Sequence, residues 1–589
     1  MHKTYLYLSI LFSLLTSLKS SAQTIPAART VHWAGAGFEG NQIDPSTIIN
    51  FRTSGGSTAT NASNDSVFTA ISNSIPVGDS AIIYFPNGDY TFNQSLNLRS
   101  NIFLVGQSTD STVLTFNLGG TGDLINISGS ALNDTARITA SLSKGSDSLT
   151  FSGNSLFNVG DFIQIIDNDA AKVTSTWSAG KSGQIVKIVA INGNIMQIDK
   201  ELRRYYLLGD QPYVRKLNMT SNNKVESLTI FRQDSTAGQT SNINLNYAYN
   251  TKLKCVKSIN CNFSHVEVNH SRNIEIEGSY FQDSYGYGAG GRAYGVVLQF
   301  TTGDCFVYNN NFNHLRHSML LQAGSNGNVL AYNHSVQPFW TGTLLPSDAA
   351  GDLVLHGNYV YANLFEGNSV ENLVIDNSHG INGPYNTFFR NRVRSYGIVM
   401  NSPQATDTTN FVGNEITNTG FFRGSYLLAG NGHFQHGNNV RGTITPNGTT
   451  TLPDSSYYFS SYPAYYSTNS SWPPFGTPHA NNLNNSEMET KYSQGILTLC
   501  SSPFVSSINN SKAEMEELSI FPNPFENSFR IKSSDKYSDI WIYDVTGKLI
   551  YQSNKVEAQI DLTSIKEGVY IIKLLSVKGE FLSRKIIKR

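Results

Sequence analysis

The sequence predicts an all-β protein whose main part is a parallel β-helix followed by a small C-terminal β-sandwich. Three observations support this prediction. Short β-rich runs recur between residues 220 and 445, each ended by Asn or Gly. Charged residues make up only 14% of the chain and glycine is plentiful at 49, so neutral polar side chains must decorate a large core. From about residue 518 the composition shifts toward Lys and Glu, in alternating apolar runs.

The first 22 residues are predicted to be a secretory signal peptide. Lys3 supplies the positive charge, Tyr5 to Leu18 form a short apolar stretch, and Ser20 to Ala22 offer small residues for cleavage. No later stretch approaches the about 20 consecutive apolar residues of a membrane span, so none is predicted. The net charge of -1 argues against a nucleic-acid partner.

The next segment is expected to close the open end of a coil stack. Asn64 is a credible N-cap for a short helix that places Val67, Phe68, Ile71 and Ile75 on one face. Such a helix would cover a sheet edge that is otherwise a template for aggregation. The run AIIYFPNGDYTF, residues 81–92, then indicates strand, turn and strand.

The repeating runs indicate coils of roughly constant length. Aligned on a pattern that ends in Asn or Gly, successive runs are 31, 24, 30, 28 and 23 residues apart, which suits a β-helix with one bend residue per coil. Buried Asn side chains stacked coil upon coil would hydrogen-bond one another, and Phe281, Phe312 and Phe389 would form internal stacks. The anchors are Gly278, Asn309, Asn333, Asn363, Asn391 and Asn414.

Residues 30 to 445 resemble the pectate-lyase-like superfamily of right-handed parallel β-helices. There a helix precedes a Phe-Pro-x-Gly-x-Tyr motif, here Phe85, Pro86, Gly88 and Tyr90. The resemblance implies a β-helix domain over residues 23–500, and says little about the reaction because one fold hosts many functions. Residues 137–216 interrupt the coil pattern and are expected to form an inserted β-rich subdomain packed on the helix.

Residues 518–589 closely resemble the type A C-terminal sorting domain of the Bacteroidetes type IX secretion system. The resemblance implies export through the periplasm to a secreted or surface-attached state, with the secretion machinery as a partner. Residues 501–517 are expected to be a linker, and Tyr457 to Trp472 to pack against the preceding domain. The matching residues are Pro522-Asn523-Pro524, Tyr543-Asp544, Gly547-Lys548, Leu562, Gly568-Val569-Tyr570 and Lys585 to Arg589.

Four cysteines are too few for a disulfide framework in a chain of 589 residues. Three of them lie in strand-like runs, and buried thiols are the favoured interpretation. Whether any pair forms a disulfide stays open at this point. The four are Cys255, Cys261, Cys305 and Cys500.

The densest polar run surrounds two arginines. Arg292 and Arg316 each precede their anchor Asn by 17 residues, which predicts matching positions on neighbouring coils, roughly 5 Å apart. Like charges so stacked repel, so a carboxylate partner or an anionic ligand is expected. Other polar residues follow in this run and in the next coils: His314, His317, Asp348, Asp352, His356, Glu366, Asp376 and His379.

Such a face suits a sugar acid as substrate. In β-elimination a cation neutralises the uronate carboxylate while a base removes the C5 proton. Arg316 would act with His317 or His379 as the base, and Arg292 would clamp carboxylates. His314, Tyr287 and Trp340 are predicted to bind the substrate. Lone His356 is expected to be a bend residue, Arg390 and Arg392 to be structural, and residues 286–291 to be a loop beside a cleft.

Two alternatives remain open. A glycoside hydrolase of the same fold would use paired carboxylates from Asp348, Asp352 or Glu366. A non-catalytic surface protein would bind glycan along Tyr285, Tyr287, Phe339 and Trp340. No metal-ligating or phosphate-binding motif is present, so no cofactor is predicted, and the sequence does not support calcium.

Overall fold

The computed structural model describes residues 24–589 apart from several short gaps. The gaps are residues 41–44, 60–61, 154–155, 289, 402–405, 467–470, 501–519, 533, 545–547 and 577–580. The predicted signal peptide and the predicted linker therefore lie outside the described residues. Within the described part, no helix is long and apolar enough to cross a membrane. The chain divides into two compact units, residues 1–505 and 506–589.

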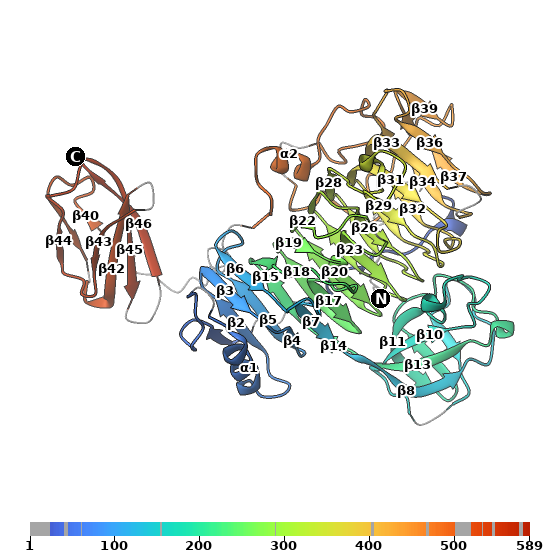
Figure 1. The fold of residues 1–589 in the computed structure, drawn as a ribbon, viewed down its shortest axis with the longest axis horizontal. Coiled ribbons are helices and arrows are strands. Elements are labelled where there is room, and N and C mark those ends of the chain that lie inside the picture. Colours follow the sequence, from blue (N-terminus) through green and yellow to red (C-terminus); the bar gives the residue numbers. More distant parts are fainter. Residues whose placement is uncertain are drawn as a thin grey trace, which may run out of the picture. The chain divides into compact units, whose positions relative to one another are not determined.

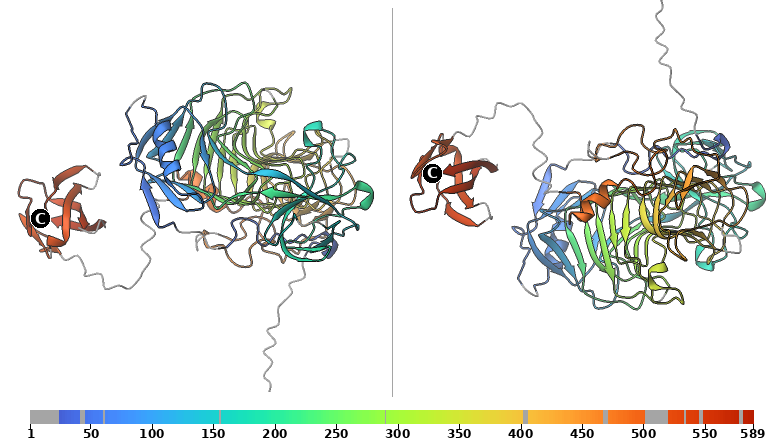
Figure 2. Two further views of the ribbon diagram at one scale, coloured as in Figure 1. Left: turned by 90° about the horizontal axis from the view of Figure 1, so that it is seen from below. Right: turned by 90° about the horizontal axis from the view of Figure 1, so that it is seen from above.

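The first unit is a parallel β-helix, which confirms the predicted fold class (Figure 1). Successive coils place their strands on three faces, here called A, B and C, and each strand pairs in parallel with its equivalents one coil away. Figure 2 shows the stack of strands from two further sides. Face A consists of β1 (Thr47–Asn50), β2 (Ala81–Phe85), β5 (Ile102–Gly106), β15 (Lys224–Glu226), β18 (Ala248–Lys254), β21 (Arg272–Glu277), β24 (Phe306–Tyr308), β27 (Val329–Ala331), β30 (Leu364–Glu366), β32 (Thr387–Phe389), β34 (Asn410–Val412) and β37 (Phe434–His436), with β14 (Thr220–Ser221) beside β18.

Faces B and C share their longest strands, β31 and β33, which bend from one face into the other. Face B consists of β3 (Gly88–Phe92), β6 (Thr112–Phe116), β16 (Thr229–Arg232), β19 (Lys257–Cys261), β22 (Tyr280–Ser284), β25 (Asn311–Asn313), β28 (His334–Val336), β31 (Ser369–Ile375), β33 (Arg392–Met400), β35 (Glu415–Ile416), β38 (Asn438–Val440) and the antiparallel β39 (Thr443–Thr445). Face C consists of β4 (Leu96–Leu98), β7 (Ile125–Ser128), β17 (Ile243–Asn246), β20 (Ser264–Asn269), β23 (Tyr294–Gln299), β26 (His317–Leu321), β29 (Leu353–Leu355), β31, β33 and β36 (Ser425–Leu427).

Aliphatic and aromatic side chains from all three faces fill one continuous core. Phe281 stacks on Phe312 at 5.2 Å between ring centroids, as predicted. The prediction for Phe389 is wrong by one residue. Phe388 forms the internal stack, whereas Phe389 points out of face A and packs against Tyr457 at 4.3 Å. Successive side chains of a strand point alternately into the core and outward, so a shift of one position exchanges the two sides.

Buried asparagines form two parallel ladders, and each coil contributes one asparagine side chain to a ladder. In the longer ladder, each side-chain amide donates to the next side-chain oxygen at 2.9–3.0 Å, through Asn310, Asn333, Asn368, Asn391, Asn414 and Asn438. The shorter ladder joins Asn328, Asn363 and Asn386. Three predicted anchors are therefore wrong. Asn310 and not Asn309 belongs to the ladder, Gly278 likewise lies one residue before Ser279, which is opposite Asn310, and Asn363 belongs to the other ladder. Along the longer ladder the coils span 23, 35, 23, 23 and 24 residues.

Helix α1 (Asp65–Ser74) packs Phe68, Ile71 and Ile75 on the first coil, in the closing position that the sequence predicts (Figure 1). Asn64 occupies the N-cap position, but its side chain makes no capping hydrogen bond. Its amide instead donates to the carbonyls of Ser57 and Thr91, and so joins the preceding loop to β3.

An inserted subdomain leaves the stack between β7 and β14 (Figure 1). Six antiparallel strands form one sheet with its own core, and they run from Ser130 to Asn218, somewhat beyond the expected 137–216. The subdomain packs against the β-helix through contacts such as the hydrogen bond from Gln164 Nε2 to Thr301 Oγ1 at 2.8 Å. Its strands are β8 (Ser130–Arg137), β9 (Ser148–Thr150), β10 (Phe162–Ile166), β11 (Gln184–Asn192), β12 (Ile195–Ile198) and β13 (Tyr213–Asn218).

Two terminal segments cover face A and the coil edges. Near the N-terminus, buried Trp33 donates from Nε1 to the carbonyl of Ala362. Aromatic residues between Tyr457 and Trp472 pack on the outer side of face A, as the sequence predicts. Residues 476–500, here called the return segment, then run back along the stack and include the short helix α2 (Glu487–Ser493).

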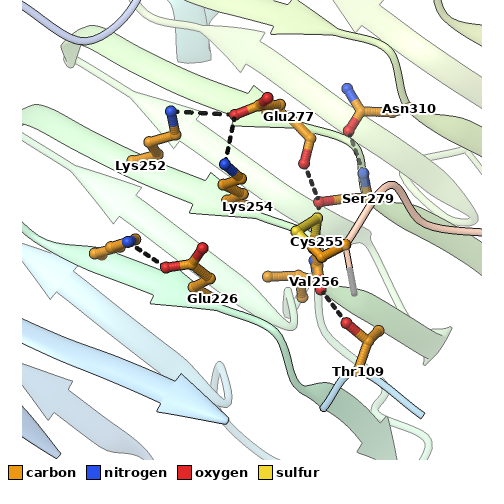
Figure 3. The surroundings of a disulfide bond; sticks show 11 residues. Thr109, Glu226, Lys252, Lys254, Cys255, Val256, Glu277, Ser279 and Asn310 are labelled. Atoms are coloured by element: carbon orange, nitrogen blue, oxygen red, sulfur yellow. Dashed lines mark hydrogen bonds and ion pairs between the residues drawn. A yellow bond between two sulfur atoms is a disulfide. The ribbon is translucent and has the colours of Figure 1, made fainter. Parts of the chain in front are cut away.

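The return segment ends in a disulfide that the favoured interpretation of the cysteines did not expect. Asn311 donates to the Leu497 carbonyl, Leu499 donates to the Gly278 carbonyl, and Cys500 is bonded to Cys255. These contacts touch three successive coils. Figure 3 shows the bond beside the ion pairs of Lys252 and Lys254 with Glu277 on face A. The remaining two cysteines, Cys261 and Cys305, are buried thiols as expected.

The second unit is a small antiparallel β-sandwich with its own apolar core. A three-stranded sheet, β40-β41-β44, packs on a four-stranded sheet, β43-β42-β45-β46. The strands are β40 (Ile520–Phe521), β41 (Ser528–Ile531), β42 (Tyr537–Asp544), β43 (Leu549–Ser553), β44 (Gln559–Asp561), β45 (Gly568–Ser576) and β46 (Phe581–Lys588).

Candidate active site

A cleft of about 1010 Å³ lies over the outer side of face C. Its floor is formed by residues of β20, β23, β26 and the strands that follow. One wall comes from the inserted subdomain through Trp177, and the other from residues 290–291 and from Trp340 to Leu345. Gly290 and Gly291 line the cleft, as expected for the glycine-rich loop.

Polar side chains gather where the face C strands end. Inward residues such as Leu321, Leu355 and Ile375 belong to the core, so the residue after each of them faces outward. The backbone ladder continues through these positions, because each N–H donates to the carbonyl of the residue before its counterpart one coil earlier. The row therefore reads Gln322, His356, Asp376 and Asn401, one polar group per coil.

His356 and Asp376 form the central pair of this row. The His356 Nδ1 atom lies 2.7 Å from Asp376 Oδ2. Burial alone raises the pKa of Asp376, but hydrogen bonds from His356 and Ser378 outweigh it, so the pKa of this carboxyl lies below its ordinary value. An ionised carboxylate only accepts, so Nδ1 of His356 carries a proton, and in the neutral tautomer Nε2 presents a lone pair.

Two further imidazoles flank this pair. The ring centroid of His317 lies 6.0 Å from that of His356, and the centroid of His379 lies 4.7 Å from it. His317 Nδ1 contacts the Gly351 carbonyl at 2.7 Å, which fixes the proton on Nδ1. Burial, with the charges of Arg316 and His356, lowers the pKa of His317 to about 3. Burial also lowers the pKa of His379. Both rings are therefore neutral at pH 7.

Arg316 brings a positive charge to the same cleft. Its guanidinium carbon lies 4.6 Å from the ring centre of Trp340 and 5.9 Å from that of Tyr294. Arg316 precedes β26, so the chain is still turning there. Arg316 and His317 consequently both line the cleft although they are adjacent in sequence. Burial raises the pKa of Tyr294, which keeps this hydroxyl protonated.

The structure does not stack Arg292 on Arg316. Ladder pairing places Tyr294 opposite His317, so the counterpart of Arg292 is Leu315. The guanidinium of Arg292 donates to the carbonyls of Thr236 and Ala237 at 3.0 and 2.7 Å instead. The predicted register fails because its anchor was Asn309, and the ladder uses Asn310.

His314 and Tyr287 lie together outside the cleft lining. His314 Nδ1 is 2.8 Å from Asp283 Oδ1, and the Tyr287 hydroxyl contacts both the ring nitrogen and the carbonyl of His314. Phe339 packs on both rings. This group supports the back of the wall that carries Trp340. Of the four predicted substrate-binding residues, only Trp340 lines the cleft.

The carboxylates proposed for hydrolysis are engaged elsewhere. Asp348 pairs with Arg423 at 3.0 Å and contacts the Tyr396 hydroxyl at 3.1 Å. Asp352 is fully buried and accepts from the N–H groups of Glu371 and Asn372, and burial raises its pKa to about 7. Glu366 is buried on face A under Tyr457. The structure does not bring these three side chains together in the cleft.

Sequence reasoning noted His356 and Asp376 but did not select them for the site. His356 follows Leu355 directly and faces outward, so the expectation of a satisfied bend residue misses its partner across the coils. The available signal in the sequence was a polar residue directly after a core residue at two strand ends, namely His356 after Leu355 and Asp376 after Ile375. Arg390 and Arg392 are structural, as expected: Arg390 donates to the Asp454, Phe475 and Thr477 carbonyls, and Arg392 pairs with Glu415.

Among the residues that the structure describes, no group of three or more His, Cys, Asp or Glu side chains is arranged to hold a metal ion. The cleft instead presents imidazoles, one guanidinium and aromatic rings. Such groups bind an anionic or polyhydroxylated ligand, and the imidazole–carboxylate pair is able to move a proton.

Comparison with known proteins identifies the second unit. Residues 519–589 match the family model described as the secretion system C-terminal sorting domain. The chain is therefore an exported protein, secreted or held at the cell surface, in agreement with the expectation from its sequence. A stretch of 72 residues is 29% identical to β-agarase D of Zobellia galactanivorans, over 12% of this chain and 15% of that protein. The chain thus matches only a small part of that relative's length.

Solved structures similar to this chain include two phage tailspikes. The Gp54 tailspike of Acinetobacter baumannii bacteriophage AP22, solved in complex with A. baumannii capsular saccharide, is 13% identical with a TM-score of 0.43, over 64% of this chain and 66% of that one. The gp49 tailspike of Pseudomonas phage LKA1 is 16% identical with a TM-score of 0.44, over 63% and 64%. Slightly less than two thirds of each tailspike chain is covered.

Proposed function

We propose that the protein is a secreted carbohydrate-active enzyme that cleaves an acidic, uronate-containing polysaccharide by β-elimination. The observation that carries the proposal is the combination of Arg316 and the His356–Asp376 pair in one cleft. Arg316 neutralises the uronate carboxylate and so lowers the energy of the carbanion-like transition state. The open cleft over stacked parallel strands admits an extended chain.

His356 acts as the base in this proposal. Its Nε2 lone pair takes the C5 proton, the C4–C5 double bond forms, and the C4–O bond breaks. The imidazolium, stabilised by Asp376, then returns the proton to the departing oxygen. Asp376 is a positioning residue because it acts through His356. Of the two bases that the sequence suggests, His317 and His379, His317 has a pKa of about 3 and is too weak a base at neutral pH.

The distribution of carboxyl groups disfavours hydrolysis in the cleft. Of the described residues that line it, only Glu267 and Asp376 carry carboxyls. Glu267 is on β20, and Asp376 follows β31 four strands further along. At about 4.8 Å per strand they stand roughly 19 Å apart, against at most about 9.5 Å for an inverting pair.

A glycan-binding protein without turnover is the second candidate. The aromatic residues in the walls favour it, since Trp177, Phe300, Tyr294 and Trp340 all line the cleft. Such side chains bind sugars without requiring any proton transfer.

A panel of acidic polysaccharides read by two assays separates these functions. Ultraviolet absorbance of the unsaturated product reports elimination, and new reducing ends report any cleavage. Replacement of His356 by Ala should lower kcat by about 100-fold or more. The same change at His32, an imidazole 76% exposed outside the cleft, should leave kcat unaltered. Reducing ends without unsaturated product would replace the proposal by hydrolysis, and binding without either signal would replace it by the glycan-binding function.

A further inference from the structure

We infer that the inserted subdomain belongs to the substrate site, and that Trp177 is the platform on which a sugar ring next to the cleaved bond stacks. The inference rests on the proposed function, because it assigns a subsite to the same cleft. It gives the subdomain a role in substrate recognition.

Trp177 lies in a 3₁₀ turn, Thr176–Ser178, within the loop between β10 and β11. Its ring centroid is 5.3 Å from that of His379 and 5.9 Å from that of Phe300, nearly perpendicular to both. These two contacts fix the indole, yet 41% of the residue remains exposed to solvent at the cleft wall. A large aromatic residue that is held in place by its neighbours but remains exposed to solvent is typical of a binding surface.

The loop that carries Trp177 is built around a buried carboxylate. Asp169 is 3% exposed and accepts hydrogen bonds from the backbone N–H groups of Gly180, Lys181 and Ser182 at 2.8–3.1 Å. The Ser182 hydroxyl donates to the same carboxylate at 3.0 Å. Four donors on one side chain hold the loop in a single conformation, so the position of Trp177 is set before any ligand arrives.

The same loop is tied to the coil that carries the proposed base. The Asn358 side-chain oxygen accepts from the N–H groups of Thr174 and Ser175 at 3.0 and 3.3 Å, and Asn358 is two residues after His356. Ser175 Oγ lies 3.2 Å from His379 Nδ1. Just before Trp177, the subdomain therefore contacts Asn358 and His379, and the His379 ring packs against the proposed base His356.

Buried charges lock the subdomain to the helix. Arg203 of the subdomain binds Asp304 and Asn326 of the helix, and Arg272 of the helix pairs with Asp199 of the subdomain at 2.6 Å. Separating the two parts would leave these charges buried and unpaired or return them to water at the cost of all their hydrogen bonds. The cleft wall that carries Trp177 therefore stays at a fixed distance from the floor formed by face C.

The spacing fits one sugar unit beyond the reacting one. The His356 and His379 rings are 4.7 Å apart and the His379 and Trp177 rings 5.3 Å apart, so the indole lies within about 10 Å of the proposed base. On the opposite wall the guanidinium of Arg316 covers the Trp340 ring. Trp177 is therefore the indole that remains available to the C–H face of a sugar ring.

The experiment compares Trp177→Ala with Trp177→Phe in the full-length protein. The matched control is Val189→Ala, an apolar residue of the same subdomain that is 48% exposed and outside the cleft lining. Alginate, polygalacturonate and hyaluronate serve as probes, in turnover assays and in affinity electrophoresis. We expect Trp177→Ala to raise KM about tenfold and to lose retardation in the gel, with kcat within about twofold. Trp177→Phe should recover most of the affinity, and Val189→Ala should match the wild type.

The two levels of inference fail differently. Turnover by the wild type with an unchanged KM in Trp177→Ala would overturn the role of Trp177 and leave the proposed function standing. A wild type that neither cleaves nor binds any of the three polymers would overturn both. Loss of kcat together with a lowered melting temperature in Trp177→Ala would show that the residue only supports the wall, which also overturns the inference.

Discussion

The asparagine ladder makes a quantitative prediction about stability. Asn368 lies near its middle and is fully buried. Its side chain accepts from the Asn333 backbone N–H at 3.1 Å and from the Asn333 amide at 2.9 Å. It donates to Asn391 Oδ1 at 2.9 Å and to the Leu330 carbonyl at 2.8 Å. Replacement of Asn368 by Ala removes all four hydrogen bonds without giving water access.

The cost follows from which groups lose a partner. The Asn333 backbone N–H is left buried and unpaired, at about 1–3 kcal/mol, and the other three bonds contribute about 1 kcal/mol each. We therefore expect Asn368→Ala to lower the free energy of unfolding by about 5 kcal/mol. Asn368→Asp would set a buried carboxylate oxygen against the Leu330 carbonyl and Asn391 Oδ1, two acceptors, so its loss should be at least as large.

Guanidinium-induced unfolding, followed by tryptophan fluorescence, measures the difference. The control is Asn126→Ala, because Asn126 donates to Asn97 at 3.1 Å in the same coil-to-coil geometry on the exposed side of the stack. Its loss should stay within about 0.5 kcal/mol. If the two alanine variants shift the unfolding midpoint equally, buried amide pairing does not stabilise the stack and the reasoning is refuted.

Three further outcomes are expected. Burial lowers the pKa of His265 from 6.5 to about 3, so the folded state loses stability as the pH falls below 6.5. From pH 7 to pH 5 the free energy of unfolding of the wild type should fall by about 2 kcal/mol more than that of His265→Gln. Parallel plots of unfolding free energy against pH for the two proteins would contradict this. Reduction of the Cys255–Cys500 bond, which spans 245 residues, should cost at most about 5 kcal/mol and expose residues 476–500 to protease; an unchanged digestion pattern would speak against the crosslink. Deletion of residues 518–589 should leave the β-helix folded, since each unit has its own core, but stop export in a type IX host; an unaltered extracellular yield would disprove it.

The sequence predicts the stack well because its period is visible, but it does not determine the register. Asn309 and Asn310 are adjacent, and either one satisfies the pattern of apolar residues ending in Asn. Two ladders run five residues apart, as Asn328 and Asn333 illustrate, so an alignment on single anchors mixes them. Only the pairing of whole strands separates these choices, and that pairing depends on contacts between coils.

The site is less accessible to sequence reasoning for the same reason. His356 and Asp376 are 20 residues apart, and their hydrogen bond exists because β29 and β31 end at the same level. The coil that carries His356, from Asn333 to Asn368, spans 35 residues instead of 23, so a linear alignment does not show that the two strands end at the same level. Trp177 comes from another subdomain, and its sequence gives no indication that it reaches His379.

The position of the disulfide decides where a pulling force on the C-terminal end enters the molecule. Without the bond, tension at residue 500 would detach Leu499 from Gly278, then Leu497 from Asn311, one contact at a time. With the bond, the load passes at Cys255 into the bend between β18 and β19, in the middle of the stack. Tension there must shear whole parallel strands, whose hydrogen bonds resist together. A β-helix held by its C-terminal end in flowing water is thereby protected from unravelling coil by coil.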